Sequence, residues 1–139
     1  MTEGNVFERD KNGNVIHYKD KNSEWWREYD LAGHDVHYKN SEGKEWWREY
    51  DAAGNEIHYK NDQGNEMWRE YDATGNEVHR KDSSGMEWWK EYDEGGKIVY
   101  YKGSNGLEGR YDSDENKLYF KFRANAEWQE YDGRGNDCV

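Results

Sequence analysis

The chain has 139 residues and a net charge of −11 at pH 7, with 37% charged and only 32% hydrophobic residues. These fractions are typical of disordered chains, but 17% of the residues are aromatic, including eight Trp and twelve Tyr. Large rings, which bury on the order of 150–250 Å² each, must therefore supply most of the apolar burial. The acidic charge disfavours direct binding to nucleic acid and favours a basic protein partner, although it would also simply keep an aromatic sheet soluble.

No stretch of the sequence suggests a membrane or an export signal. No apolar run approaches the length of a membrane span, and no signal-peptide core follows Met1. We therefore expect a cytoplasmic protein that does not contact membranes.

The dipeptide Tyr-Asp recurs along the chain at a nearly fixed interval. It begins at Tyr29, Tyr50, Tyr71, Tyr92, Tyr111 and Tyr131, with intervals of 21, 21, 21, 19 and 20 residues. Arg9-Asp10 occupies the same place one unit earlier. A fixed period of this length indicates a tandem repeat.

One unit, residues 45–65, shows the expected elements in chain order. Residues 45–51 and 56–60 are short and rich in aromatic or β-branched side chains, which is typical of strands. Residues 52–55 and 61–65 have turn composition, and Asp51 followed by Gly54-Asn55 predicts a type I turn closed by a left-handed glycine. Two hairpin turns in 21 residues leave no room for a crossover helix. The sequence thus predicts an all-β antiparallel meander of about thirteen strands.

We expect one repeat domain over residues 1–139, with regular repeats over about 5–102 and irregular repeats over 103–139. The segment 103–126 lacks the Trp pair and carries Gly109 in mid-strand, so it forms either a cap or a specialised contact patch. Thirteen flat strands would span roughly 60 Å, and open sheets rarely exceed about ten strands without curling. The sheet is therefore expected to curl or to pack face to face in a homodimer.

Counting pairs back from the turn predicts which side chains share a face. With Asp51 opposite Asn55, Glu49 would lie opposite Ile57, and Trp47 opposite Tyr59. The face expected to form the core carries Trp and aliphatic rows with Tyr and Phe: Trp26, Trp47, Trp68, Trp89, Trp128, Ile16, Val36, Ile57, Val78, Val99, Leu118, Tyr18, Tyr38, Tyr59, Tyr101 and Phe120. A register slip of one residue would exchange the two faces.

The opposite face is the candidate binding surface, a ladder of cations and rings. Its candidate residues are Tyr29, Tyr50, Tyr71, Trp25, Trp46, Trp88, Arg27, Arg48, Arg69, His37, His58 and His79. Equivalent histidines lie two strands apart, about 10 Å, whereas zinc ligands converge at about 2.0–2.2 Å, so packing rather than metal binding is expected. Nothing in the sequence indicates a cofactor or a catalytic group.

Cys138 falls in the slot that Ile57 and Val78 occupy in earlier units. A free cysteine there would act as a small hydrophobic side chain. The alternative is an intermolecular disulfide near a frayed chain end.

The Tyr-Asp-x-x-Gly-Asn motif resembles YD (Rhs-type) repeats. The residues that match are Tyr29-Asp30 with Gly33, Tyr50-Asp51 with Gly54-Asn55, and Tyr71-Asp72 with Gly75-Asn76. The resemblance implies a long curling β-sheet that serves as a shell or binding surface in bacterial toxin-related proteins. In size the chain looks more like the small stand-alone arrays of bacteria and their phages.

Three functions are compatible with these features. The first is a non-enzymatic, protein-binding inhibitor or immunity-type protein that blocks a basic partner, such as a nuclease or a nucleic-acid-guided defence effector. Tyr, Trp and Arg are enriched at the centres of such interfaces. The second is a glycan-binding module that uses aromatic rows, and the third is a scaffold or shell fragment.

Overall fold

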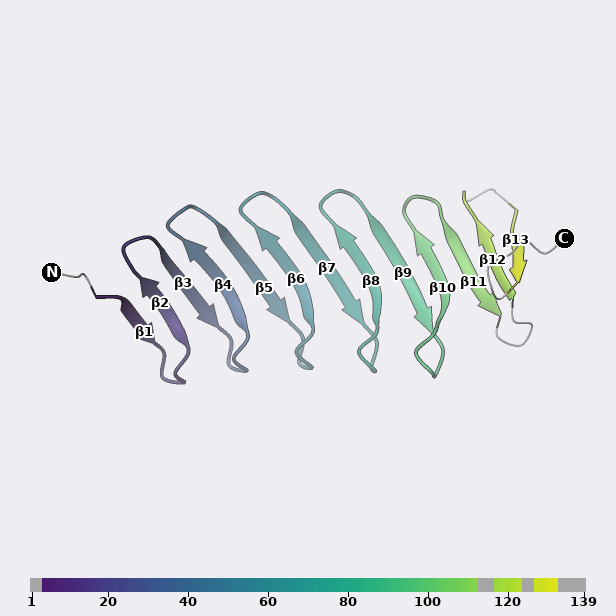
Figure 1. The fold of residues 1–139 in the computed structure, drawn as a ribbon. Helices are drawn as coiled ribbons and strands as arrows, with labels where there is room; N and C mark the ends of the chain where they lie inside the picture. The colour runs from purple at the N-terminus through teal and green to yellow at the C-terminus, as the bar shows by residue number, and fades with distance from the viewer. Residues whose placement is uncertain (1–3, 113–116, 124–126, 133–139) are drawn as a thin grey trace. The chain divides into compact units, whose positions relative to one another are not determined.

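The computed structural model describes residues 4–112, 117–123 and 127–132, and Figure 1 shows its strands. Thirteen strands, and no helix, are found in this part of the chain. The strands occupy the sheet in their chain order, β1 to β13, and neighbouring strands pair antiparallel. The predicted all-β meander of hairpins is therefore confirmed. In the described ranges there is no helix of the kind that could span a membrane.

The chain divides into two compact units, residues 1–68 and 69–139, which are described separately. The first unit contains β1 (Val6–Arg9), β2 (Val15–Lys19), β3 (Glu24–Tyr29), β4 (Asp35–Asn40), β5 (Glu45–Tyr50) and β6 (Glu56–Asn61). The boundary falls within β7 (Glu66–Tyr71). The second unit contains β8 (Glu77–Asp82), β9 (Glu87–Tyr92), β10 (Ile98–Gly103), β11 (Glu108–Asp112), β12 (Lys117–Lys121) and β13 (Gln129–Asp132).

The turns after the Tyr-Asp dipeptides that begin at Tyr29, Tyr50, Tyr71 and Tyr92 have the predicted geometry. The Gly54 N–H donates to the Asp51 carbonyl at 3.0 Å, and the Asp51 N–H donates to the Asn55 carbonyl at 2.9 Å. Gly54 has a φ of 88°, in the left-handed region where other residues pay a steric penalty. The turns after β4, β6, β8 and β10 also contain such a glycine, for example Gly64 with a φ of 81°, whereas the turn after β2 contains none.

The aspartate of the dipeptide holds this turn together. Asp51 Oδ1 accepts the N–H groups of Ala53 and Asn55 at 2.9 Å each, and the Asn55 side chain donates to Oδ2 at 3.1 Å. Bonds of this kind stabilise the carboxylate, so the pKa of Asp51 is lowered. In the next unit, the Asn76 N–H and then the Thr74 hydroxyl lower the pKa of Asp72 to about 2.

The tyrosine of the dipeptide ties its hairpin to the preceding one. The Tyr29 hydroxyl donates to the Val15 carbonyl at 3.2 Å, and the Tyr50 hydroxyl reaches the Asp35 carbonyl at 3.3 Å. In the second unit, the Tyr92 hydroxyl donates to the Glu77 carbonyl at 2.8 Å. The Tyr-Asp motif therefore has a structural role at both of its residues.

The predicted register is wrong by one residue on the second strand of the hairpin. Tyr50 pairs with Glu56 and Glu49 with His58, so Ile57 is the extra residue of a β-bulge. The same shift leaves Ile16, Val36 and Val99 without a cross-strand partner. A bulge inserts one residue and so reverses the faces of all side chains beyond it.

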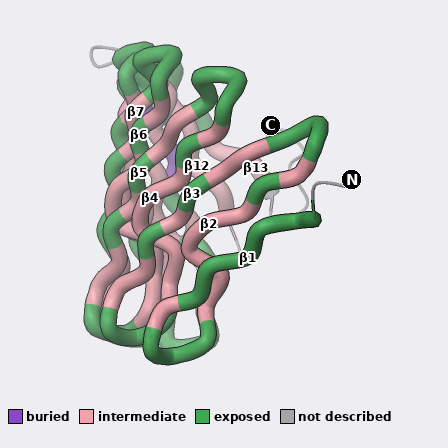
Figure 2. Tube along the Cα trace, turned by 90° about the vertical axis from the view of Figure 1, so that its left-hand side faces the viewer, coloured by how far each residue is buried: buried purple, intermediate pink, exposed green. Residues whose placement is uncertain are grey.

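The predicted core is also wrong. Among the described residues, no hydrophobic side chain is buried, and Trp47, which the expected core included, is 39% exposed. Figure 2 shows the alternative: exposed turns at both ends and mostly half-buried strands between them. The sheet is held by contacts across its strands rather than by an interior.

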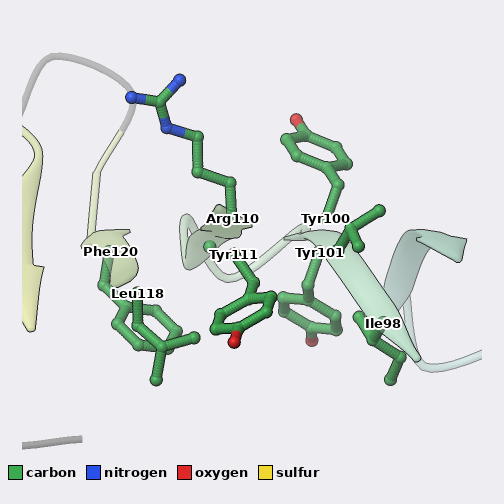
Figure 3. A pocket seen from close by; sticks show the side chains of 9 residues that line it. Ile98, Tyr100, Tyr101, Arg110, Tyr111, Leu118 and Phe120 are labelled. Carbon is green, nitrogen blue, oxygen red and sulfur yellow. The ribbon is translucent and has the colours of Figure 1, made fainter. Parts of the chain in front are cut away.

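The irregular repeats of the second unit contain an apolar hollow lined by aromatic and aliphatic side chains. In Figure 3, the side chains of Ile98, Tyr101, Tyr111, Leu118 and Phe120 point to one side of the sheet. Gly109 pairs with Phe120, and a Cβ on Gly109 would lie 2.7 Å from the Phe120 ring. The mid-strand glycine therefore makes room for a ring. Cys138 lies outside the described residues.

Gly33 provides a direct test of the turn geometry. Its φ is 91°, and a Cβ at this position would have nothing within 4 Å, so Gly33→Ala introduces backbone strain without a clash. We expect it to lower the free energy of unfolding in urea by about 1–2 kcal/mol. Gly33→Asn should cost less, because Asn tolerates the left-handed region. Gly4→Ala, at an open site without positive φ, is the control, and an equal cost there would contradict the turn assignment.

Candidate functional site

The bulges sort the side chains of the regular repeats into two different faces. One, named here the Tyr–Arg face, carries the first Trp of each pair with Arg or Lys and the tyrosines of both strands. Its members are Tyr18, Trp25, Arg27, Tyr29, Tyr38, Trp46, Arg48, Tyr50, Tyr59, Met67, Arg69, Tyr71, Arg80, Trp88, Lys90 and Tyr92.

Rings and cations alternate in contact across the Tyr–Arg face. Tyr38 stacks on Trp46 with ring centroids 5.6 Å apart, and the Arg48 guanidinium lies 4.2 Å from the Trp46 ring centroid. The same arrangement places Arg27 over Trp25 at 4.9 Å and Lys90 over Trp88 at 4.0 Å.

Acidic residues at the bulges complete this face. Glu56 pairs with Tyr50 on this face, and Glu56 Oε2 lies 3.3 Å from Arg48 Nε. From the preceding hairpin, Asp35 Oδ1 lies 3.4 Å from Arg48 Nη1. Arg48 is thus held between two carboxylates, which compensate its partial burial.

The opposite side, named here the Trp–His face, repeats a cross-strand row of Glu, His and Trp. The four rows are Glu8–His17–Trp26, Glu28–His37–Trp47, Glu49–His58–Trp68 and Glu70–His79–Trp89. In the irregular part, Tyr100 takes the place of the histidine and pairs with Glu91.

The geometry within a row is nearly the same each time. His37 stacks flat on Trp47, with centroids 5.2 Å apart and an interplanar angle of 9°. Its Nε2 lies 2.8 Å from a Glu45 carboxylate oxygen, and its Nδ1 lies 3.6 Å from Glu28. The histidine is therefore fixed by a ring beneath it and by a carboxylate at each nitrogen.

The Trp–His face is the more open of the two. Trp26, Trp47 and Trp68 are each 39% exposed, whereas Trp25 and Trp46 are only partly exposed. The side chains of the row glutamates are 61–73% exposed, while the histidines are 16–24% exposed. Solvent thus meets Trp rims, the row carboxylates and the exposed Lys39 and Lys60, which lie opposite Trp26 and Trp47.

The structure divides the candidate binding residues predicted from the sequence. The Tyr, Trp and Arg candidates share the Tyr–Arg face, where they contact one another. His37, His58 and His79 lie on the opposite face, so their predicted packing beside Tyr and Arg is wrong and is replaced by packing on Trp. Trp47 and its equivalents are exposed contrary to expectation, because residues expected beside them, such as Tyr59, lie on the other face beyond the bulge.

Histidines and carboxylates lie close together, but they do not converge as metal ligands do. No group of three or more His, Cys, Asp or Glu suited to a metal ion occurs among residues 4–112, 117–123 and 127–132. The row of His79 holds instead a pairing with Glu70 and Glu87 that depends on the proton of the histidine. Burial lowers the pKa of His79, but hydrogen bonds to Glu87 and then Glu70 outweigh it, so the pKa of His79 is raised above 6.5.

Comparison with known proteins identifies the fold. No protein-family model matches the chain, and no curated protein matches it. Among solved structures, it is similar to part of a mutant of the Photorhabdus luminescens Tc holotoxin pore, with 14% identity and a TM-score of 0.63. The match covers 90% of this chain but 8% of that one.

A second solved structure, TcdB2-TccC3-TEV, matches with 10% identity and a TM-score of 0.38, over 96% of this chain and 12% of that chain. The first similarity, together with the hairpin meander, confirms the resemblance to YD-repeat arrays in fold. The chain is a tandem β-hairpin repeat.

The two adjacent tryptophans of β5 should differ in their effect on stability. Trp46→Ala removes a Tyr stack and a cation–π contact on the more covered face, and we expect it to lower the free energy of unfolding by about 2–3 kcal/mol. Trp47→Ala removes a more exposed ring and should cost about 1 kcal/mol less. Urea unfolding of both variants measures the difference, and a larger loss for Trp47→Ala would contradict the face assignment.

The raised pKa of His79 predicts a pH-dependent contribution to stability. Because its folded-state pKa lies above the unfolded value of 6.5, the stabilisation is fully present below that value. It is lost as pH rises through the folded-state pKa. The stability difference between the wild-type chain and His79→Gln should thus be larger at about pH 5.5 than at about pH 8. Equal differences in urea unfolding at both pH values would refute this assignment.

Proposed function

We propose that the chain is a non-enzymatic, protein-binding repeat protein whose Trp–His face binds a basic partner. The observation that carries the proposal is the row of partly exposed Trp side chains beside exposed glutamates in the described regular repeats. Trp is enriched at the centres of protein interfaces, and complementary charge speeds association and selects partners.

The basic partner that fits an acidic protein best is one that itself binds nucleic acid. A nuclease or a nucleic-acid-guided defence effector has a basic groove in which an acidic sheet competes with the natural ligand. The chain would then act as an inhibitor or immunity-type protein. It would do so without contacting nucleic acid directly, since its charge of −11 repels phosphates.

The test is affinity capture with three matched baits. The first is the wild-type chain, and the second is Glu8→Gln/Glu28→Gln/Glu49→Gln, which neutralises three exposed carboxylates of the Trp–His face. The third, Glu42→Gln/Glu94→Gln/Glu127→Gln, makes the same charge change at exposed positions outside the rows. Captured proteins are quantified by mass spectrometry, and any enzyme among them is assayed with added bait.

A basic protein retained by the wild-type and control baits, but reduced about tenfold with the face variant, is the expected result. Inhibition of that protein by the wild-type chain supports the inhibitor role. Equal capture by all three baits, or capture without any basic protein, overturns the assignment of this face.

The fold similarity favours a second candidate, a scaffold that assembles through its sheet. It would fit the homodimer expected for a sheet with rings on both faces. Light scattering over a range of protein concentrations tests whether the chain assembles. A monomer at every concentration would rule out the scaffold role. A glycan-binding role is a further alternative that the exposed Trp row permits.

A further inference from the structure

Each histidine of the Trp–His face lies between two glutamates that differ in exposure. The inner glutamate comes from the following strand, and its side chain is 24–27% exposed. The outer glutamate comes from the preceding strand, and its side chain is 61–73% exposed. The four groups, each within one compact unit, are Glu8–His17–Glu24, Glu28–His37–Glu45, Glu49–His58–Glu66 and Glu70–His79–Glu87.

The two contacts of each histidine also differ in length. In all four groups, Nε2 lies 2.8–3.0 Å from the inner carboxylate, whereas Nδ1 lies 3.3–3.6 Å from the outer one. A neutral imidazole has one N–H donor and one bare nitrogen, so it donates to only one of two carboxylates. The shorter contact assigns that donor to Nε2. Only a second proton, on Nδ1, can therefore bind the outer glutamate.

A lysine completes the charge of each group. By strand register, the lysines on the histidine strands pair with the inner glutamates: Lys19 with Glu24, Lys39 with Glu45, Lys60 with Glu66 and Lys81 with Glu87. The other glutamate beside Trp47 on β5, Glu49, contacts the next histidine, His58. Two glutamates and one lysine give each group one net negative charge while its imidazole is neutral. Protonation of the imidazole reduces that charge to zero.

We propose that protonation of these histidines controls whether the outer glutamates are available to a basic partner. While the imidazoles are neutral, Glu8, Glu28 and Glu49 accept the cations of the partner. Once the imidazoles are protonated, they occupy the same carboxylates, and the groups lose the net charge that attracts a basic protein. The Trp–His face thus binds its partner at higher pH and releases it as the pH falls. This inference rests on the proposed function, whose regulation it describes.

The His79 group shows which protonation state the arrangement favours. Burial lowers the pKa of His79, but hydrogen bonds to Glu87 and Glu70 outweigh it and raise the pKa above 6.5. Histidine changes its charge near neutral pH, where lysine and glutamate side chains ordinarily keep theirs. Linkage is reciprocal, so a partner that occupies the outer glutamates must expel protons from the histidines.

The first experiment measures the affinity of the full chain for an octalysine peptide with a fluorescent label on its N-terminus. Fluorescence anisotropy is recorded at low salt, at about pH 8 and about pH 6. Lysine side chains stay protonated at both values, so the probe keeps its charge. We expect the wild-type chain to bind about tenfold more weakly at the lower pH, because four groups lose their net negative charge.

Two variants assign the effect to the face. The first replaces its four histidines: His17→Gln/His37→Gln/His58→Gln/His79→Gln. Glutamine does not titrate, so the affinities at the two pH values should differ by less than about twofold. The second, His34→Gln, is the matched control, because His34 stacks on Tyr50 of the Tyr–Arg face with ring centroids 4.5 Å apart. It should keep the tenfold difference, and circular dichroism confirms that both variants are folded.

Proton release is a second measurement, and it needs no substitution. Titration calorimetry of the wild-type chain with the same peptide, at about pH 7 in two buffers of different ionisation enthalpy, counts the protons exchanged on binding. We expect protons to be released to the buffer. Binding without proton release overturns the inference, as does an unchanged wild-type affinity or an equal loss of affinity in the four-histidine variant.

Failure of this inference is distinguishable from failure of the proposed function. The capture experiment is repeated at both pH values with the wild-type bait and with Glu8→Gln/Glu28→Gln/Glu49→Gln. If a basic protein depends on these glutamates but is captured equally at both pH values, the proposed function stands and the control by protons is wrong. If the variant bait captures that protein as well as the wild-type bait at the higher pH, the proposed function itself is wrong.

Discussion

One extra residue in each hairpin, the β-bulge, determines which side chains share each face of the sheet. The bulge at Ile57, and its equivalents at Ile16, Val36 and Val99, shifts the pairing by one position. Without it, His58 would share a face with Tyr50 and Arg48; with it, His58 lies on Trp68 and beside Glu49. The bulge also moves Tyr59 to the face of Arg48, where the two residues pair. The composition of both faces therefore follows from this local departure from regular pairing.

The turns and strands could be predicted from the sequence because their determinants are local. A left-handed glycine with an aspartate three residues earlier is sufficient to specify the turn, and residues 45–51 specify a strand by composition. The bulge has no comparable signal in one unit: Glu56-Ile57-His58 alternates like any strand. Regular pairing counted from Asp51 is correct for Tyr50, which pairs with Glu56, and is wrong from Glu49 onward, because Glu49 pairs with His58. All the misplaced residues, including His37 and Tyr59, follow from that single step.

The absence of a buried hydrophobic side chain in the described residues changes how stability must arise. A sheet without an interior depends on pairs across its strands, each contributing roughly 0.2–1 kcal/mol. Rings serve this purpose better than aliphatic side chains, because a ring stacks on a neighbour and also accepts a cation, as Trp46 does with Tyr38 and Arg48. Charged side chains lie along the rings, which explains how a chain with 37% charged residues remains ordered.

The two faces consequently differ in how strongly their side chains are involved in ordering the strands. On the Tyr–Arg face, hydroxyls reach back to the preceding hairpin and guanidinium groups are held by acids, so most substitutions there disturb the contacts that order the strands. On the Trp–His face, each row is complete within three strands and leaves one Trp rim and one carboxylate to solvent. The rows also link successive hairpins, since His37 of β4 stacks on Trp47 of β5, and the Trp rims and outer carboxylates that they hold in place can be matched to a partner. The extra residue at Ile57 creates this surface, because it places the histidines against the Trp row and the tyrosines of the same strands on the other face.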